Sequence, residues 1–90
     1  MEFIHEKNRI YATGDTGKLL AEVTFPLNAQ GAYNINRTFV DPSLRGQGVA
    51  GQLLQAAAAD IEKAGGRAAP TCSYAMDWFQ KHPEYAGLLK

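Results

Sequence analysis

The sequence predicts a single α+β domain over residues 1–90, with the element order ββββ–loop–α–β–α and a mixed, mainly antiparallel sheet. Short alternations of apolar and polar residues, separated by turn residues, fill the chain up to Val40 and are typical of an antiparallel meander of up to four strands. From Val49 onward the apolar residues recur with the period of a helix. A short strand and a second helix follow, so the chain has two halves of different character.

Four strands are expected in the first half, over residues 2–7, 9–13, 18–25 and 32–40. The strongest turn signal, Gly14-Asp15-Thr16-Gly17, separates the second strand from the third, and Pro26 ends the third. Successive side chains of a strand point to opposite faces of a sheet. The fourth strand is therefore expected to place Tyr33, Ile35, Arg37 and Phe39 on one face, and Asn34, Asn36, Thr38 and Val40 on the other.

The first helix is expected to begin near Val49 and to end at Gly65-Gly66, which is a helix-ending signal. Its apolar face consists of Val49, Leu53, Leu54, Ala57, Ile61 and Ala64. A strand over residues 67–71 comes next, and a crossover helix should bring it parallel to the strand at 32–40. A second helix is expected over residues 73–82, where His82-Pro83 stops it, and residues 84–90 are expected to form a tail.

Composition narrows the possible functions. Nine basic and nine acidic residues cancel, so bulk charge supports neither a nucleic-acid nor a membrane-surface role. The only cysteine, Cys72, cannot form a disulfide within the chain or a cysteine-rich metal site by itself, and no metal is expected. The first residues lack the pattern of a secretory signal, and no apolar run approaches the length of a membrane span. We therefore expect a cytoplasmic location.

A glycine-rich segment lies between the fourth strand and the first helix, and it runs from Arg45 to Gly51. Free backbone N–H groups and the positive end of a helix dipole at such a turn form a site for a phosphate or pyrophosphate. The segment lacks the Lys-Ser or Lys-Thr of a Walker loop. Its glycine spacing matches a dinucleotide fingerprint, but too little chain follows for a complete nucleotide-binding fold. The alternative is a turn whose glycines serve packing only.

The element Arg45-x-x-Gly48-x-Ala50 resembles the coenzyme A site of acetyltransferases. Together with Arg37-Thr38-Phe39-Val40, Pro70-Thr71-Cys72-Ser73-Tyr74 and His82-Pro83-Glu84-Tyr85, it makes essentially the whole chain similar to the short, single-domain branch of the GNAT acyl-CoA N-acyltransferases. This resemblance implies a GNAT-like ββββαβα fold, with the first helix after a pyrophosphate loop. It also implies acetyl-CoA as cosubstrate and an amine as acceptor.

The resemblance further implies roles for particular positions. The backbone of Phe39 and Val40 would bind the pantetheine arm, and the thioester would lie between the strand that ends at Val40 and the strand that ends at Thr71. Backbone N–H groups of one segment would bind the pyrophosphate, namely those of Arg45, Gly46, Gln47, Gly48, Val49, Ala50 and Gly51. The branch is short on the acceptor side, so an open acceptor site is expected, which suits a macromolecular or poorly selective amine.

The sequence departs from the family pattern at two positions. Arg37 stands where members of the short branch often carry a histidine, and Phe79 stands where larger relatives often carry a proton-donating tyrosine. Cys72 and Tyr74 therefore become the candidates for protonating the departing thiolate. Each also has a plainer interpretation, Cys72 as a small buried residue and Tyr74 as a packing aromatic.

Three other polar residues are expected to have structural roles. His5 is expected at the surface, His82 at a helix end, and Glu22 as a solvated carboxylate on a strand, although a carboxylate there could relay a proton from the amine.

Three functions stay open on this evidence. The first is an N-acetyltransferase in which a small-molecule amine, a protein lysine or a protein N-terminus attacks acetyl-CoA directly. The second is a module that binds acetyl-CoA or coenzyme A with little catalysis, and the third is a small interaction protein. A monomer or weak dimer is expected.

Overall fold

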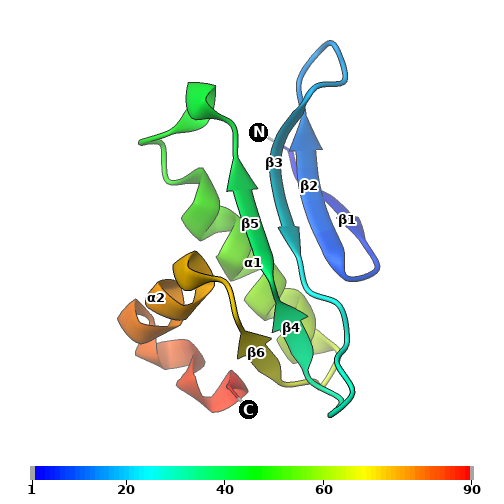
Figure 1. Cartoon of the computed structure of the whole chain (residues 1–90), viewed down its shortest axis with the longest axis vertical. Helices are drawn as coiled ribbons and strands as arrows, with labels where there is room; N and C mark the ends of the chain where they lie inside the picture. Colours follow the sequence, from blue (N-terminus) through cyan, green and yellow to red (C-terminus); the bar gives the residue numbers. More distant parts are fainter. Residues whose placement is uncertain (1, 90) are drawn as a thin grey trace.

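The protein consists of a twisted sheet and two helices, as seen in a computed structural model that describes residues 2–89 (Figure 1). Four strands form an antiparallel sheet in the order β1-β2-β3-β5. Their bounds are Ile4–Glu6 for β1, Arg9–Thr13 for β2, Leu19–Thr24 for β3 and Arg37–Val40 for β5. β4 (Tyr33–Ile35) pairs in parallel with β6 (Ala68–Pro70), which confirms the parallel neighbour expected after a crossover helix.

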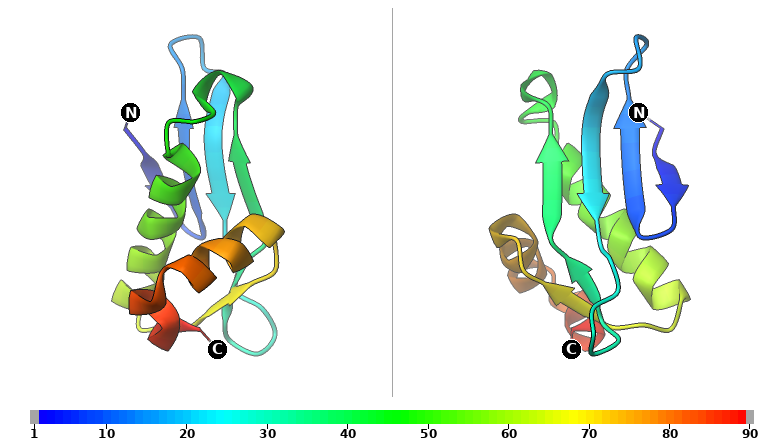
Figure 2. Two further views of the ribbon diagram at one scale, coloured as in Figure 1. Left: turned by 90° about the vertical axis from the view of Figure 1, so that its left-hand side faces the viewer. Right: turned by 45° about the vertical axis from the view of Figure 1, so that its right-hand side comes forward.

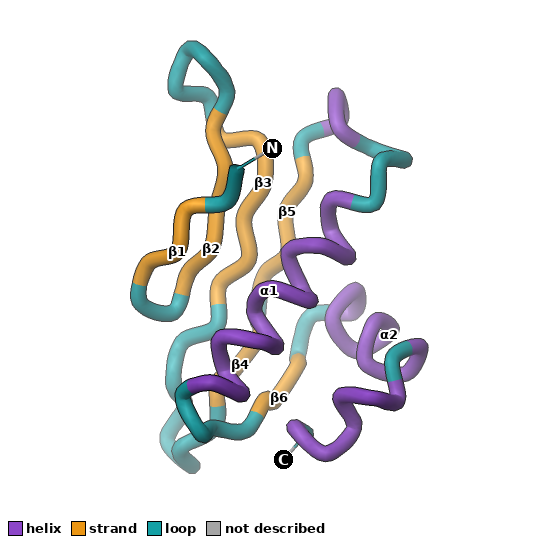
Figure 3. Tube along the Cα trace, turned by 180° about the vertical axis from the view of Figure 1, so that it is seen from behind, coloured by secondary structure: helices purple, strands orange, loops and turns teal. Residues whose placement is uncertain are grey.

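Two helices lie on the same side of these strands. α1 (Val49–Lys63) crosses one face of the sheet, and α2 (Ser73–Lys81) packs beside it next to β6 (Figure 3). Both begin at the residues that the sequence predicts. Two short 3₁₀ helices complete the chain, η1 (Pro42–Leu44) before the glycine-rich segment and η2 (Pro83–Leu88) near the end. The expected tail at 84–90 is therefore wrong over most of its length.

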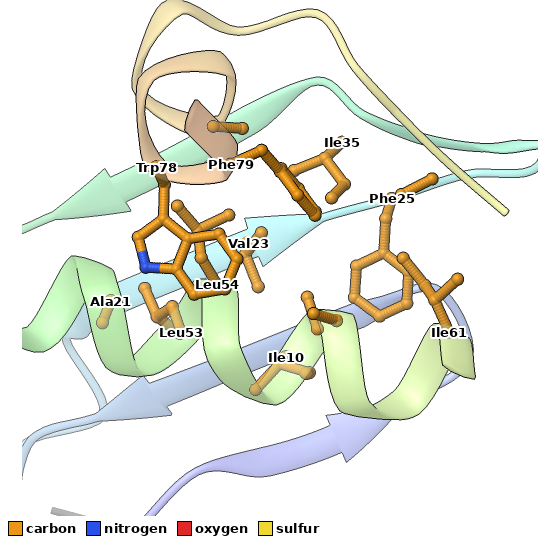
Figure 4. Packing of buried hydrophobic residues seen from close by; sticks show 14 of the residues in the cluster. Ile10, Ala21, Val23, Phe25, Ile35, Leu53, Leu54, Ile61, Trp78 and Phe79 are labelled. Atoms are coloured by element: carbon orange, nitrogen blue, oxygen red, sulfur yellow. The ribbon is translucent and has the colours of Figure 1, made fainter. Parts of the chain in front are cut away.

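The core lies between α1, α2 and the sheet. Leu53, Leu54 and Ile61 of α1 pack against Ile10 and Val23 of the strands (Figure 4). α2 contributes two large side chains to the same cluster, Trp78 and Phe79, whose rings meet edge to face at a centroid distance of 5.1 Å. Phe79 is thus a core residue, as expected for an apolar residue at helical spacing, and it has no proton to donate.

The expected continuous strand over 32–40 is wrong, because it breaks at Asn36 into β4 and β5. The predicted alternation fails at the same point. Ile35 is fully buried in the core, whereas Arg37 lies opposite Thr24 in register and bonds to Glu22 on the other face. Thr38 lies opposite the buried Val23, so it returns to the helix-covered face.

The break divides the sheet into two diverging parts. β4 continues beside β6, and the Ile35 carbonyl accepts hydrogen bonds from the N–H groups of Thr71 and Cys72, at 3.0 and 3.3 Å. β5 instead follows β3, which is its only strand neighbour in the part of the chain that the structure describes. We call the point between Asn36 and Thr71, where the two parts separate, the fork. Beyond the fork, one edge of β5 is left without a strand partner.

Candidate functional site

The segment that leaves β5 is fixed at its start by Asp41. The Asp41 carboxylate accepts hydrogen bonds from the Ser43 N–H at 3.0 Å and from the Ser43 hydroxyl at 2.6 Å, and it pairs with Lys18 at 3.4 Å. Asp41 is buried and caps η1. The hydrogen bonds from the Ser43 side chain and backbone, with help from Lys18, hold the pKa of Asp41 below its ordinary value of 3.8.

The glycine-rich segment then turns into α1. Gly46 and Gly48 have φ angles of 81° and 74°, a left-handed region that glycine enters without steric cost. Gly48 is the residue that caps α1, and within residues 2–89 no side-chain hydrogen bond caps the helix. No acidic residue lies in that turn either. The positive end of α1 is therefore available to an anion, as the sequence predicts.

A cavity of about 570 Å³ connects this segment with β5 and α2. It is lined by Thr38, Val40, Leu44, Arg45, Gly46, Gly48, Val49, Ala50 and Tyr74. Most of the predicted cofactor residues are thus gathered around one cavity, together with one predicted catalytic residue, Tyr74.

Three predicted cofactor residues do not line the cavity. They are Phe39, Gln47 and Gly51. The Phe39 side chain lies on the opposite face of the sheet, near Arg37. Sequence reasoning missed Thr38 and Leu44 as lining residues. The strand alternation does predict that Thr38 shares a face with Val40, and that alternation is the signal for Thr38.

Cys72 lies beside the cavity. Its Sγ atom is 3.5 Å from the Thr38 hydroxyl, and it accepts a hydrogen bond from the Ala75 N–H at 3.4 Å, so the side chain caps α2. The residue is half-buried and free of any disulfide. Tyr74 is 47% exposed, and the structure gives its hydroxyl no hydrogen-bond partner among residues 2–89. The Cys72 thiol is therefore the more firmly positioned of the two predicted proton donors.

Both histidines lie away from this cavity. His5 Nδ1 is 2.7 Å from an Asp60 oxygen, and both side chains are at the surface. His82 Nδ1 is 2.8 Å from the Trp78 carbonyl oxygen, and its ring stacks on the Trp78 ring at a centroid distance of 4.1 Å. Each thus has the structural role that the sequence indicates.

Glu22 differs from the expected solvated carboxylate, because it is only 9% exposed. One carboxylate oxygen accepts a hydrogen bond from Arg9 Nε at 2.5 Å and the other from Arg37 Nε at 3.0 Å. Burial by itself would raise the pKa of Glu22, but the hydrogen bonds from the two guanidinium groups outweigh it and hold this pKa below its ordinary value of 4.5. A carboxylate with both oxygens occupied in this way is a poor proton acceptor.

These two carboxylates predict how stability depends on pH. Because the pKa values of Glu22 and Asp41 are lowered in the folded state, the unfolded chain binds protons first as the pH falls. Their contribution to stability is complete above the ordinary values of 4.5 and 3.8 and should be lost as the pH falls through the folded pKa values. Urea unfolding at a series of pH values between about 7 and 3 measures the loss.

The matched variant for this measurement is Glu22→Gln, which cannot titrate at position 22. We expect it to be less stable than the wild type at neutral pH and to lose less stability on acidification. A wild-type slope in the variant would show that the ion pairs of Glu22 are energetically neutral.

Within residues 2–89, no group of three or more His, Cys, Asp and Glu side chains has a metal-binding arrangement. In the same range, neither helix has the length and apolar character needed to cross a membrane.

Comparison with known proteins agrees with this geometry. A family model described as GCN5-related N-acetyl-transferase matches residues 9–88. The structure superimposes with a TM-score of 0.81 on the NMR structure of a GCN5-like protein from Staphylococcus aureus, at 28% sequence identity, and covers 99% of this chain and 87% of that one. No curated protein matches the chain in a sequence search.

Larger proteins share part of the fold. A GNAT-family protein from Desulfovibrio desulfuricans gives a TM-score of 0.56 at 26% identity over 66% of this chain. A ribosomal-protein-alanine N-acetyltransferase from Brucella melitensis gives 0.55 at 19% identity over 84% of this chain. The chain spans only 38% and 61% of their respective lengths.

Proposed function

The chain belongs to the GCN5-related N-acetyltransferase family, and we propose that it transfers the acetyl group of acetyl-CoA to an amine that attacks the thioester directly. The observation that carries this proposal is the cavity that joins the N-terminus of α1 to β5 and α2. The cavity adjoins the N-terminus of α1, and its wall on β5 includes Thr38, whose hydroxyl is 3.5 Å from the half-buried Cys72 thiol. This arrangement fits a cosubstrate with a pyrophosphate and a thioester.

The two ends of the cavity would bind different parts of acetyl-CoA. The pyrophosphate would lie at the glycine-rich segment, where backbone N–H groups and the α1 dipole favour negative charge. Arg45 adds a cation there. The pantetheine arm would lie along the edge of β5 that has no strand partner, since an extended ligand can bond to such an edge as another strand does.

The reaction needs an acceptor nitrogen, a polarised carbonyl and a proton for the leaving sulfur. The neutral amine forms a bond to the carbonyl carbon, with a backbone N–H near Val40 stabilising the oxygen as charge develops on it. The carbon–sulfur bond then breaks, and the departing thiolate takes the proton of the Cys72 thiol, either directly or through the Thr38 hydroxyl at 3.5 Å. The proton lost by the amine passes to water, and water restores the Cys72 thiol.

Holding the amine and the thioester together at the fork would supply much of the rate. Tyr74 would shape the cavity wall, and its hydroxyl is the alternative proton source. A cytoplasmic location and a monomer or weak dimer remain predictions of the sequence.

A second candidate function is a coenzyme A-binding module with little catalysis. It is favoured by the cavity lining, which contains no Asp, Glu or His among residues 2–89, and by Glu22, both of whose oxygens are occupied. Phe79 is buried and cannot act as an acid. In this case the glycine-rich segment would bind acetyl-CoA as tightly as in the enzyme, but no acetyl group would leave it.

Thiol release separates these functions. We expect the protein to release coenzyme A from acetyl-CoA faster in the presence of an amine panel than without amine, measured with a thiol reagent. The panel should hold lysine, a polyamine, glycine and short peptides with free N-termini. Calorimetric binding of acetyl-CoA without amine-dependent release of coenzyme A would favour the binding module. If the protein shows neither binding nor release, the glycines serve only the fold.

A further inference from the structure

The fork adjoins both faces of the sheet, and the cavity described above lies on only one of them. Thr38 and Val40 line the cavity on the helix-covered face. The opposite face has no helix over it in residues 2–89 (Figure 2, right). If acetyl-CoA fills the cavity, as proposed above, the amine reaches the thioester from this uncovered face.

The polar side chains at the fork on this face present hydrogen-bond donors. Asn36 Oδ1 accepts from the Thr24 hydroxyl at 2.6 Å, and Asn34 Oδ1 accepts from the Thr71 hydroxyl at 2.6 Å. Their amide NH₂ groups have no partner in the part of the chain that the structure describes. Glu22, the carboxylate that Arg37 binds, is buried and has both oxygens paired. Among residues 2–89, these side chains at the fork therefore offer hydrogen-bond donors and no unpaired carboxylate.

Arg37 is the charged member of this group. It follows Asn36 directly, its side chain is 54% exposed, and only its Nε atom is engaged, with Glu22 at 3.0 Å. The bond to Glu22 fixes the guanidinium group, and the Phe39 ring lies 5.4 Å from its central carbon. The terminal nitrogens have no partner among residues 2–89. The parallel N–H groups of these two nitrogens match the two oxygens of a carboxylate.

We propose that Arg37 binds a carboxylate on the acceptor, so that the preferred amine carries a carboxylate close to its nitrogen. A free amino acid and a peptide N-terminus followed by an acidic residue both fit this description. A polyamine does not, because it would bring positive charge to Arg37 without a free carboxylate to balance it. This inference rests on the proposed acetyl transfer and names its acceptor class.

The test compares acceptors that differ only in the carboxylate. Glycine and glycinamide represent the free amino acid, and Gly-Asp-amide and Gly-Asn-amide represent the peptide. For each pair, the ratio of kcat/KM for the charged acceptor to that for the uncharged acceptor is measured in the wild type and in variants, so the intrinsic reactivity of each amine cancels. We expect Arg37→Gln to lower the ratio about tenfold, mainly through KM, and Arg37→Lys to lower it less.

Arg9→Gln is the matched control. Arg9 also bonds to Glu22, but from β2, which is separated from β5 by β3. We expect this variant to keep the wild-type ratio. The pair of acceptors whose ratio changes identifies whether the carboxylate belongs to an amino acid or to a peptide.

Three results would overturn the assignment. The first is an unchanged ratio in Arg37→Gln for both pairs, and the second is an equal fall in Arg9→Gln, which would give Arg37 only a structural role. The third is a wild-type preference for the polyamine. Acetyl-CoA affinity and thermal unfolding of each variant show whether the fold and the cofactor site are intact. Wild-type protein without turnover on any amine would contradict the proposed function itself, which is a different outcome.

Discussion

Replacing Gly48 with glutamate is expected to raise the Kd for acetyl-CoA at least about a hundredfold. Gly48 lines the cavity, and a Cβ atom built there meets no atom within 4 Å, so the new side chain enters open space at the N-terminus of α1. Its carboxylate would occupy the position proposed for the pyrophosphate. Two like charges about 4 Å apart near a protein surface repel by about 4 kcal/mol, whereas a hundredfold change needs about 2.8 kcal/mol. Calorimetric titration of acetyl-CoA measures the effect.

Gly65→Glu is the matched control, because the two glycines have nearly the same backbone. Gly65 has a φ angle of 73° against 74° for Gly48, and a Cβ at either position has no neighbour within 4 Å. Both variants therefore carry a similar conformational strain and the same added charge. Gly65 lies just beyond the other end of α1, so Gly65→Glu should bind acetyl-CoA as the wild type does. Wild-type affinity in Gly48→Glu would mean that the cofactor binds elsewhere.

Much of the fold follows from local signals in the sequence. α1 begins at Val49 because a glycine at position 48 can take the left-handed conformation that starts the helix, and its apolar period selects the face that packs. α2 begins at Ser73 directly after Cys72, which caps it. The glycine-rich segment and most of the cavity lining could be predicted for the same reason, since they are consecutive residues at a strand-to-helix turn.

The fork could not be predicted from such signals. Asn34 and Asn36 are residues of low strand propensity, but without a glycine or proline beside them they do not fix where the strand breaks. The break depends on competition between β3 and β6 for neighbouring parts of one segment, and these partners lie on opposite sides of it in the sequence. The burial of Glu22 could not be predicted either, because its two partners come from other strands, β2 and β5. A single carboxylate on an alternating strand gives no sign of them.

The fork is also the part of the molecule that unites the proposed chemistry. The strand edge proposed for the pantetheine arm exists because β5 separates from β6 there. Thr38 and Arg37 are consecutive residues of β5, so they face opposite sides of the sheet. The cofactor cavity and the donor group for the acceptor are thereby placed on the two sides of one strand. The break at Asn36 would thus supply the strand edge for the proposed cosubstrate, and the alternation of β5 would direct Arg37 toward the proposed acceptor.

The second large effect is expected at Cys72. Its sulfur is held between the Thr38 hydroxyl and the Ala75 N–H, next to the cavity wall. If this thiol protonates the departing thiolate, Cys72→Ala should lower kcat about a hundredfold, at the lower end of the range for a lost general acid. The Kd for acetyl-CoA should change little, because no proposed contact with the cosubstrate is removed. Steady-state kinetics with the best acceptor of the panel, combined with calorimetry, measures both quantities.

Two further variants decide between proton transfer and support of the fold. Cys72→Ser keeps a side chain that can bond to Thr38 and cap α2, but its hydroxyl gives up a proton far less readily than a thiol. Proton transfer predicts that Cys72→Ser is as slow as Cys72→Ala, whereas a capping role predicts that serine restores the rate. Tyr74→Phe should keep kcat within a few-fold of the wild type, because Tyr74 is exposed and its hydroxyl has no partner among residues 2–89. If instead Tyr74→Phe lowers kcat about a hundredfold and Cys72→Ala does not, the proton comes from Tyr74. Cys72 is then a capping residue of α2.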